Sequence, residues 1–172
     1  MGLIQFCPSC GCHGLSVEDG KHWRCQNCGF QYFHNVASAV AGILVCGNEI
    51  LLTRRKFDPG KGMLDLPGGF VDYGESLEEA MARECEEEIG LTQLNWQYLF
   101  SFPNQYLYAE VLYHTQDAFF VAEMADKPQV LARDDVAEAL WVPKERLDIS
   151  SIAFESIKNA LQKFLSVPDQ RF

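Results

Sequence analysis

The stretch GGFVDYGESLEEAMARECEEEIGL (68–91) concentrates negative charge in a segment whose composition favours a helix. Glu84, Glu86, Glu87 and Glu88 follow one another almost directly. Like charges at helical spacing repel each other and weaken a helix by about 0.2–0.5 kcal/mol per pair. A solvated face tolerates this repulsion, whereas a bound cation would turn it into attraction. The first explanation makes the segment structural, and the second makes it a metal site.

The ends of this helix can be predicted from the sequence. Ser76 and Glu79 form an S-x-x-E capping box, and Gly90 fits the left-handed position that follows many helices. The helix is therefore expected from about Ser76 to Ile89. One side of it carries apolar residues at i, i+4 spacing, which predicts packing on a core. These residues are Leu77, Met81, Cys85 and Ile89.

The acidic side of the helix has the chemistry of a ligand set. At 100° per residue, Glu84, Glu87 and Glu88 lie on one side of the helix, at positions i, i+3 and i+4. Carboxylate oxygens are hard ligands that suit Mg²⁺ or Mn²⁺. Arg83 can hold a neighbouring carboxylate through a bidentate contact. Gly68 lets the backbone pass close to a ligand and offers its carbonyl oxygen.

The spacing of the charged and glycine residues resembles the Nudix box, G-x5-E-x7-R-E-U-x-E-E-x-G-U, in which U is a bulky apolar residue. Gly69 and Glu75 occupy the first two fixed positions, and the run RECEEEIGL (83–91) supplies the rest. The one departure is Cys85 at a U position, where a small hydrophobe still packs. This match favours the metal site over the solvated face.

The Nudix resemblance implies hydrolysis of a diphosphate that joins a nucleoside to another group. The catalytic residues that it implies are Glu84, Glu87, Glu88, Arg83 and Glu75. The implied ligands of a catalytic Mg²⁺ (or Mn²⁺) are the Gly68 carbonyl, Glu84, Glu87 and Glu88. Family members differ in which glutamate activates the water, and we predict Glu84 for this chain.

Candidate substrate contacts lie outside the box. Arg54 and Arg55 end an expected strand (49–55) and could meet a phosphate, although basic residues at strand ends are commonly just solvated. Phe102 and Tyr106 could stack on a base, or serve as ordinary aromatic residues of a hairpin. Some Nudix members also use an acidic residue from a loop before the last strand, where the alternative is a solvated loop. The candidates there are Asp134, Asp135 and Glu138.

The first 35 residues carry a second metal signal, Cys7-x2-Cys10-x14-Cys25-x2-Cys28. This spacing is typical of a four-cysteine zinc ribbon, in which four thiolates close the coordination of a structural Zn²⁺. Cys12 and His13 are either spare ligands or ordinary loop residues.

A zinc ribbon followed by a Nudix domain resembles the NADH pyrophosphatase branch of the family. That branch carries the signature S-Q-P-W-P-F-P-x-S after the box, whereas this chain has SFPNQYLY (101–108). The segment LDLPGGFVD (64–72) looks more like ADP-ribose pyrophosphatases and general Nudix pyrophosphatases. The resemblance therefore implies hydrolysis of ADP-ribose, NADH or a related dinucleotide to a nucleoside monophosphate such as AMP. Alternatives are nucleoside triphosphates, dinucleoside polyphosphates, NAD-capped RNA, or a non-catalytic role as a nucleotide-sensing regulator.

The predicted organisation is a zinc ribbon (1–35) and a Nudix hydrolase domain (36–172). Strands are expected at 36–46, 49–55, 95–102, 105–114, 117–124 and 139–142, with a loop at 57–69 and a closing helix within 148–165. Many strands between two helices predict an α+β fold, an α/β/α sandwich with a mixed sheet.

Composition limits the partners and the location. The 172 residues carry a formal net charge of -10, which argues against a phosphate-backbone binder, so a nucleic-acid partner is not expected. The sequence shows no signal peptide and no apolar run long enough to cross a bilayer, so a cytoplasmic protein without membrane contact is predicted. The expected partner is a small nucleotide substrate, and the family resemblance implies a homodimer.

Overall fold

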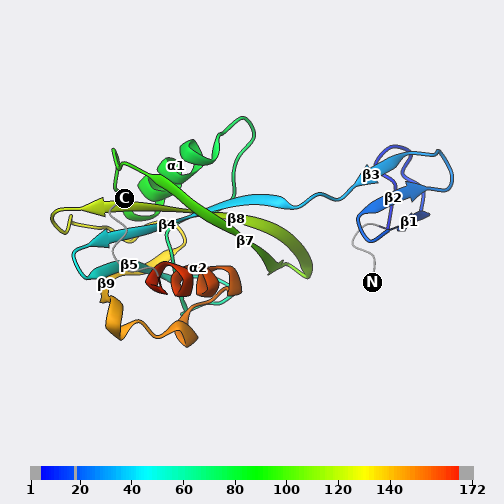
Figure 1. The fold of residues 1–172 in the computed structure, drawn as a ribbon. Coiled ribbons are helices and arrows are strands. Elements are labelled where there is room, and N and C mark those ends of the chain that lie inside the picture. The colour runs from blue at the N-terminus through cyan, green and yellow to red at the C-terminus, as the bar shows by residue number, and fades with distance from the viewer. Residues whose placement is uncertain (1–4, 18, 167–172) are drawn as a thin grey trace. The chain divides into compact units, whose positions relative to one another are not determined.

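The protein is described from a computed structural model, which places residues 5–17 and 19–166. The chain divides into two compact units, Met1–Val36 and Ala37–Phe172 (Figure 1). The division lies one residue from the boundary that the sequence composition suggests. Among the described residues, no helix combines the length and the apolar character needed to cross a membrane.

The first unit is built on a small antiparallel sheet. Its strands are β1 (Leu15–Val17), β2 (His22–Cys25) and β3 (Gln31–Phe33), in the order β1-β2-β3. Two similar turns carry the cysteine pairs. The Gly11 N–H donates to the Cys7 carbonyl (2.8 Å), and the Gly29 N–H donates to the Cys25 carbonyl (3.0 Å). Both glycines adopt positive φ, which a glycine reaches without steric cost.

The second unit contains a six-stranded mixed sheet in the order β6-β5-β4-β8-β7, with β9 pairing to β5. Strands β4 and β8 are parallel over ten residue pairs, and the other neighbours are antiparallel. This confirms the predicted mixed sheet. The strands are β4 (Ala37–Cys46), β5 (Glu49–Arg55), β6 (Leu64–Asp65), β7 (Gln97–Tyr108), β8 (Val111–Met124) and β9 (Val136–Pro143).

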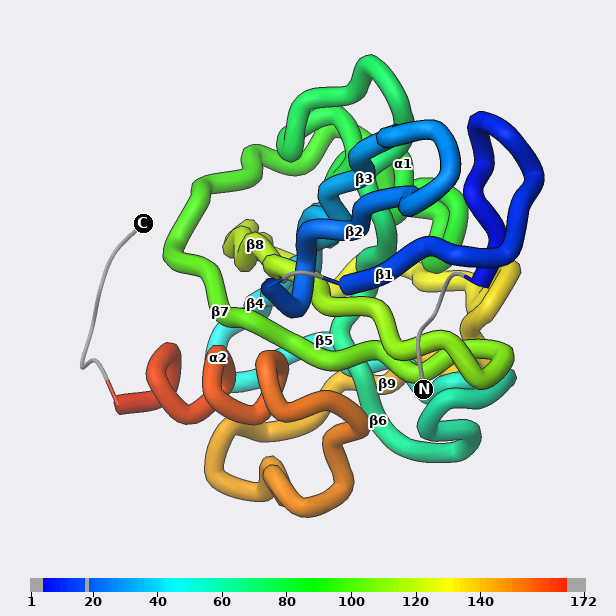
Figure 2. Tube along the Cα trace, turned by 90° about the vertical axis from the view of Figure 1, so that its right-hand side faces the viewer, coloured from blue at the N-terminus to red at the C-terminus, as the bar shows by residue number. Residues whose placement is uncertain are grey.

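Two helices cover this sheet from opposite faces: α1 (Leu77–Ile89) lies on one face and α2 (Glu155–Ser166) on the other (Figures 1 and 2). Alternate residues of β4 explain why both faces must be covered. Ile43 and Val45 pack in the core that contains Leu161 of α2, whereas Leu44 packs in the core that contains Met81 of α1. Successive side chains of a strand point to opposite faces, so an apolar strand needs two covering layers. The predicted α/β/α sandwich is confirmed.

The ends of α1 are those that the sequence predicts. The Ser76 hydroxyl accepts the Glu79 N–H (3.2 Å), and the Glu79 carboxylate accepts the Ser76 N–H (2.8 Å). Gly90 ends the helix in the left-handed conformation, with φ 73°. The apolar side is buried through Ala80, Met81, Cys85 and Ile89.

The prediction of three strands between 95 and 124 is wrong. Two long strands, β7 and β8, form one hairpin through Ala109 and Glu110. Both turn residues adopt left-handed backbone conformations, with φ 47° and 66°. Such turns usually carry Asn-Gly or a similar pair, so the sequence Ala-Glu gave no turn signal. Pro103 lies within β7, which is the last strand in the order of the sheet, where a proline is tolerated.

The prediction of a closing helix within 148–165 needs a correction at its start. Short 3-10 turns occupy Lys144–Arg146 and Ile149–Ser151, and α2 begins only at Glu155. The Asp148 carboxylate accepts the Ser150 N–H (2.9 Å) and caps the second turn. This local bond competes with a continuous helix, as short polar side chains often do.

We predict that Glu110→Gly raises the free energy of unfolding by about 0.5–1 kcal/mol. A left-handed conformation costs an L-residue about 1–2 kcal/mol, and the larger unfolded-state entropy of glycine offsets part of that gain. Urea denaturation measures the change. Glu110→Ala is the control, because it removes the same charge and keeps the strained backbone. An equal gain from Glu110→Ala would assign the effect to charge and contradict the prediction.

Candidate functional site

A cavity of about 370 Å³ lies in the second unit, between the start of β4, the segment that follows β6, and the acidic side of α1. Residues of the β7–β8 hairpin, of the loop before β9 and of the start of α2 complete its wall. Its lining residues include Asp65, Gly68, Gly69, Phe70, Arg83, Glu84, Glu87, Glu88, Tyr106, Thr115, Asp117, Asp134, Asp135 and Phe154.

The segment 66–72 lies between β4 and α1 because it contains two glycines. It bonds to β4 through the Val40 N–H and the Gly69 carbonyl, at 2.9 Å. A side chain at Gly68 would place its Cβ 2.1 Å from the Val40 carbonyl oxygen, and one at Gly69 would lie 2.5 Å from a Glu84 oxygen. At Gly68 the contact is with backbone, so only glycine allows this close approach, whereas a side chain at Gly69 would displace the Glu84 carboxylate.

Arg83 connects this segment to the helix. Its guanidinium makes a bidentate contact with Glu75, at 2.7 and 2.9 Å, and donates to the Phe70 carbonyl at 3.0 Å. Its third nitrogen donates to Glu84 (2.9 Å) and to Glu87 (3.1 Å). The Arg83 bond lowers the pKa of Glu75 to about 2, so that carboxylate is charged at neutral pH. Arg83 and Glu75 thus hold together the loop and the helix that carry the box.

The three carboxylates of α1 lie at different depths. The side chain of Glu87 is 51% exposed, that of Glu84 is 14% exposed, and Glu88 is buried with one oxygen accepting the Gly68 N–H (3.0 Å). Burial raises the pKa of Glu84, and burial together with the charges of Asp65 and Glu84 raises that of Glu88 well above its usual value. A solvated face does not explain a buried Glu88 that lies beside the charge of the partly buried Glu84. Carboxylate oxygens that are crowded together in this way suit a hard divalent cation, which would offset their repulsion.

The three acidic residues predicted near the last strand lie in two different places: two of them line the cavity and one does not. Asp134 and Asp135 line the cavity, and their charges raise the pKa values of Glu84 and Glu88 respectively. Glu138 lies outside the lining and pairs with Arg54 at 2.9 Å, with both side chains partly exposed. The loop therefore contributes further acidic oxygens to the site through its two aspartates.

Of the other predicted substrate contacts, one lines the cavity and the rest lie outside its lining. Tyr106 lines the cavity, whereas Phe102 packs against Phe100 and Phe119 in the core on the α2 side. Arg55 does not line the cavity directly, but its Nη1 donates to Asp65 at 2.7 Å. For Arg54, Arg55, Phe102 and Glu138, contact with a substrate stays a prediction.

Several lining residues escaped the sequence reasoning. Asp65, Asp117 and Thr115 are buried polar residues on strands, and Phe70 and Phe154 are aromatic residues in connecting segments. The available signal was a charged residue inside an apolar strand, as in TQDAFFVA (115–122). Such a charge is rarely buried without a partner or a function.

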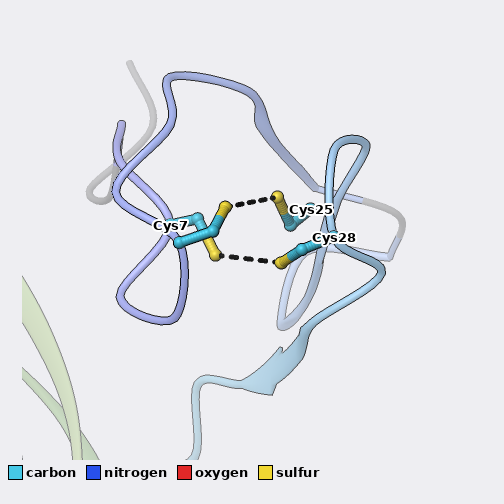
Figure 3. Close-up of side chains that lie close together, drawn as sticks. Cys7, Cys25 and Cys28 are labelled. Atoms are coloured by element: carbon cyan, nitrogen blue, oxygen red, sulfur yellow. Dashed lines mark hydrogen bonds between the residues drawn. The ribbon is translucent and has the colours of Figure 1, made fainter.

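The first unit holds a separate group of possible metal ligands. The sulfur atoms of Cys7, Cys10, Cys25 and Cys28 all lie within 4.8 Å of one another. The sulfur of Cys7 is 3.7 Å from that of Cys28, and the two side chains point toward each other (Figure 3). The Cys12 backbone N–H lowers the pKa of Cys10 to about 6, which favours a thiolate. Four converging cysteine sulfur atoms fit the ligand set of Zn²⁺.

Comparison with known families decides where the chain belongs. The sequence model of the NUDIX domain matches residues 36–164. The chain belongs to the Nudix family. The family resemblance drawn from the box is thereby confirmed.

Curated relatives of this Nudix chain carry names of two kinds. The NAD-capped RNA hydrolase NudC of Haemophilus influenzae (strain PittGG) is 28% identical over 143 residues, which are 80% of this chain and 50% of that protein. The chain thus spans about half the length of the NudC relatives that it matches. The ADP-ribose pyrophosphatase of Methanocaldococcus jannaschii is 50% identical over 62 residues, 36% of this chain and 37% of that protein.

Solved structures share the fold. A NUDIX hydrolase from Nitrosomonas europaea has a TM-score of 0.71 and 23% identity, covering 94% of this chain and 90% of that chain. The NUDIX domain of Shewanella oneidensis NrtR complexed with ADP ribose has a TM-score of 0.64 and 22% identity, covering 77% and 88%. At these identities the likeness supports the fold alone.

We predict that Glu88→Gln stabilises the protein in magnesium-free buffer at about pH 8 by about 1–3 kcal/mol, because it removes a buried charge and keeps an acceptor for the Gly68 N–H. The folded pKa of Glu88 lies above the value of 4.5 for a free glutamate, so its contribution to stability falls as pH rises above about 4.5. The variant should lose this part of the pH dependence.

Urea denaturation across pH measures both effects. Glu86→Gln is the matched control, because Glu86 is exposed on the same helix and outside the cavity. An equal gain from Glu86→Gln would mean that net charge is responsible, which would contradict the prediction.

Proposed function

We propose that this chain is a Mg²⁺-dependent Nudix pyrophosphohydrolase, which cleaves a nucleoside diphosphate linked to another group. The observation that carries the proposal is the pair of carboxylates formed by partly buried Glu84 and buried Glu88, which repel one another at the wall of a ligand-sized cavity. Folding a protein around such charges is unfavourable unless they bind a cation. The complete Nudix box and the hydrolase names of the curated relatives support the same conclusion.

The donor set assigns a role to each residue of the box. Glu84, Glu87, Glu88 and the Gly68 carbonyl would hold Mg²⁺ or Mn²⁺, which neutralises the diphosphate charge and makes a bound water acidic. Arg83 keeps two of these carboxylates oriented. The Gly68 N–H orients the third.

Glu84 is the proposed general base. Arg83 donates to its Oε1, so Oε2 would take the proton of the attacking water. Burial raises the pKa of Glu84, which strengthens it as a base near neutral pH.

The proposed substrate is ADP-ribose, NADH or a related dinucleotide, with AMP as a product. Phe70, Tyr106 and Phe154 give the cavity aromatic walls, and flat aromatic surfaces suit a nucleobase. The two kinds of curated relative are named for NAD-capped RNA and for ADP-ribose, and both substrates contain an ADP group joined to a ribose.

A second candidate is NAD-capped RNA. It is favoured by the name of relatives that match 80% of the chain. The net charge of -10 opposes it, because contact with an RNA backbone usually requires a basic surface. A purely sensing role ranks below both because the box is complete. Nucleoside triphosphates and dinucleoside polyphosphates also rank below both, because neither curated relative is named for them. A homodimer and a cytoplasmic location are proposed from the family resemblance and the sequence.

The activity is tested by incubating the protein with ADP-ribose and with NADH in Mg²⁺, and by measuring AMP chromatographically. We expect AMP from at least one substrate, and a loss of about 10³-fold in Glu87→Gln, because a metal-binding carboxylate supplies several kcal/mol of barrier lowering. Glu86→Gln should retain the rate. AMP from neither substrate, with folded protein, would contradict the proposed substrate class.

We also propose a structural Zn²⁺ held by Cys7, Cys10, Cys25 and Cys28. The unit that carries them has a three-stranded sheet and few buried side chains, so a metal would supply much of its stability. We expect about one zinc per chain by elemental analysis.

Cys28→Ser should lose most of this zinc and become sensitive to protease cleavage within residues 5–36. Cys46→Ser is the control, because Cys46 lies in β4, outside the sulfur cluster. Full zinc content in Cys28→Ser would rule out this ligand set.

A further inference from the structure

The wall of the cavity holds two buried carboxylates that do not belong to the Nudix box. Asp65 lies on β6 and is 6% exposed, and Asp117 lies on β8 and is 7% exposed. Both line the cavity, as does Glu88. The mechanism proposed above gives neither aspartate a role, so another reason for burying these charges is needed.

Asp117 is held in an orientation fixed by two hydroxyl groups. Its Oδ1 accepts the Thr115 hydroxyl at 2.5 Å, and its Oδ2 accepts the Ser156 hydroxyl at 2.6 Å. Both hydroxyl residues are themselves buried, and they come from β8 and from the first turn of α2. A carboxylate oxygen has two acceptor sites, so each oxygen retains one acceptor after these bonds. Asp117 is thus a rigid acceptor at the wall of the cavity.

Asp65 is held in place by Arg55, which does not itself line the cavity. Arg55 Nη1 donates to Asp65 Oδ2 at 2.7 Å, and the Leu66 N–H donates to Oδ1 at 2.8 Å. Arg55 is itself held by the Pro59 carbonyl (2.6 Å) and lies over the Phe154 ring, 4.8 Å from its centre. Arg55 thus pairs with Asp65, whereas the hydrogen-bond partners of Asp117 are neutral hydroxyl groups, so the guanidinium does not pair with the second carboxylate.

The chemistry around Asp65 and Asp117 selects the part of a substrate that can lie there. Without a cation, a diphosphate would be repelled by Asp65 and Asp117 as well as by the α1 carboxylates, so it belongs beside the proposed metal ligands of α1, where a cation would offset the charge. Groups that donate N–H or O–H bonds would be attracted. Two aromatic rings stand beside the acceptors: Tyr106 and Phe154 lie 5.5 Å apart, at 38°. Aromatic walls with fixed acceptors suit a flat ring that carries an amino group.

We propose that Asp117, supported by Asp65, is a specificity-determining residue, which recognises a hydrogen-bond donor on the nucleoside part of the substrate. An exocyclic amino group of the base is the favoured donor, and a ribose hydroxyl is the other source of the same chemistry. An analogue with a carbonyl in place of the amine would face a carboxylate with no proton between them. A site that accepts a hydrogen bond from its substrate discriminates against analogues that lack the donor by a factor of about 10² or more in kcat/KM. This inference rests on the proposed function.

The test compares kcat/KM for ADP-ribose, its inosine analogue and its 2′-deoxyadenosine analogue. The wild type should discriminate against one analogue by about 10²-fold or more. A lower kcat/KM for the inosine analogue would identify the amino group of the base as the recognised donor. A lower kcat/KM for the deoxy analogue would identify the sugar hydroxyl. In Asp117→Asn the discrimination should fall below about tenfold, because the amide offers a donor as well as an acceptor. Asp126→Asn is the matched control, since Asp126 is exposed outside the cavity.

Equal rates for all three substrates in the wild type would overturn the proposal. So would an equal loss for all three in Asp117→Asn, because that pattern marks a structural role. Asp65→Asn provides the same comparison if Asp117→Asn does not fold.

A wild type that hydrolyses none of the three would refute the proposed function but not the subsite. In that case, calorimetry that measures the affinities for adenosine, inosine and 2′-deoxyadenosine tests the subsite. Preference for adenosine over one analogue, reduced in Asp117→Asn, supports the subsite, and equal or absent binding rejects it.

Discussion

The Arg83 guanidinium is the contact on which the rest of the site depends. It joins Glu75 and the Phe70 carbonyl, which belong to the loop, to Glu84 and Glu87, which belong to α1. A planar group with five donors can satisfy all four partners at once, and a lysine cannot. The loop in turn passes close to β4 because Gly68 has no side chain, and the absence of one at Gly69 leaves room for the Glu84 carboxylate. One arginine and two glycines therefore set the distance between the sheet and the acidic helix.

This arrangement opposes stability in the absence of a cation. Arg83 compensates Glu75 and part of the charge of Glu84 and Glu87, but Glu88 has a backbone N–H and acidic neighbours. The surrounding structure must supply the free energy that holds these carboxylates together. The two apolar cores on either face of β4 provide it, through side chains such as Leu44 and Ile43 that are fully buried. Strain of this kind is a common feature of sites that bind charged ligands.

The cavity lining combines two kinds of chemistry, which would together orient the proposed substrate. The α1 residues gather oxygen ligands for a hard cation, which suits the diphosphate. The lining outside α1, with Asp117, Asp65, Tyr106 and Phe154, offers acceptors and aromatic surfaces, which would suit a nucleoside. A substrate with a charged middle and a flat, donor-bearing end matches this polarity. The relatives named for ADP-ribose and for NAD-capped RNA act on molecules of this type.

The sequence by itself determined the features that depend on neighbours in the chain. The capping box at Ser76, the end of α1 at Gly90 and the shared side of Glu84, Glu87 and Glu88 all follow from the fixed geometry of a helix. The cysteine pairs repeat a local turn that a glycine permits. Tertiary structure decided the features that join distant segments. Asp65, Asp117 and Ser156 meet only because β6, β8 and α2 pack around one cavity, and no local pattern encodes that meeting. The β7–β8 hairpin was missed for a related reason, since pairing along the whole length of two strands overrides the weak turn propensity of Ala109 and Glu110.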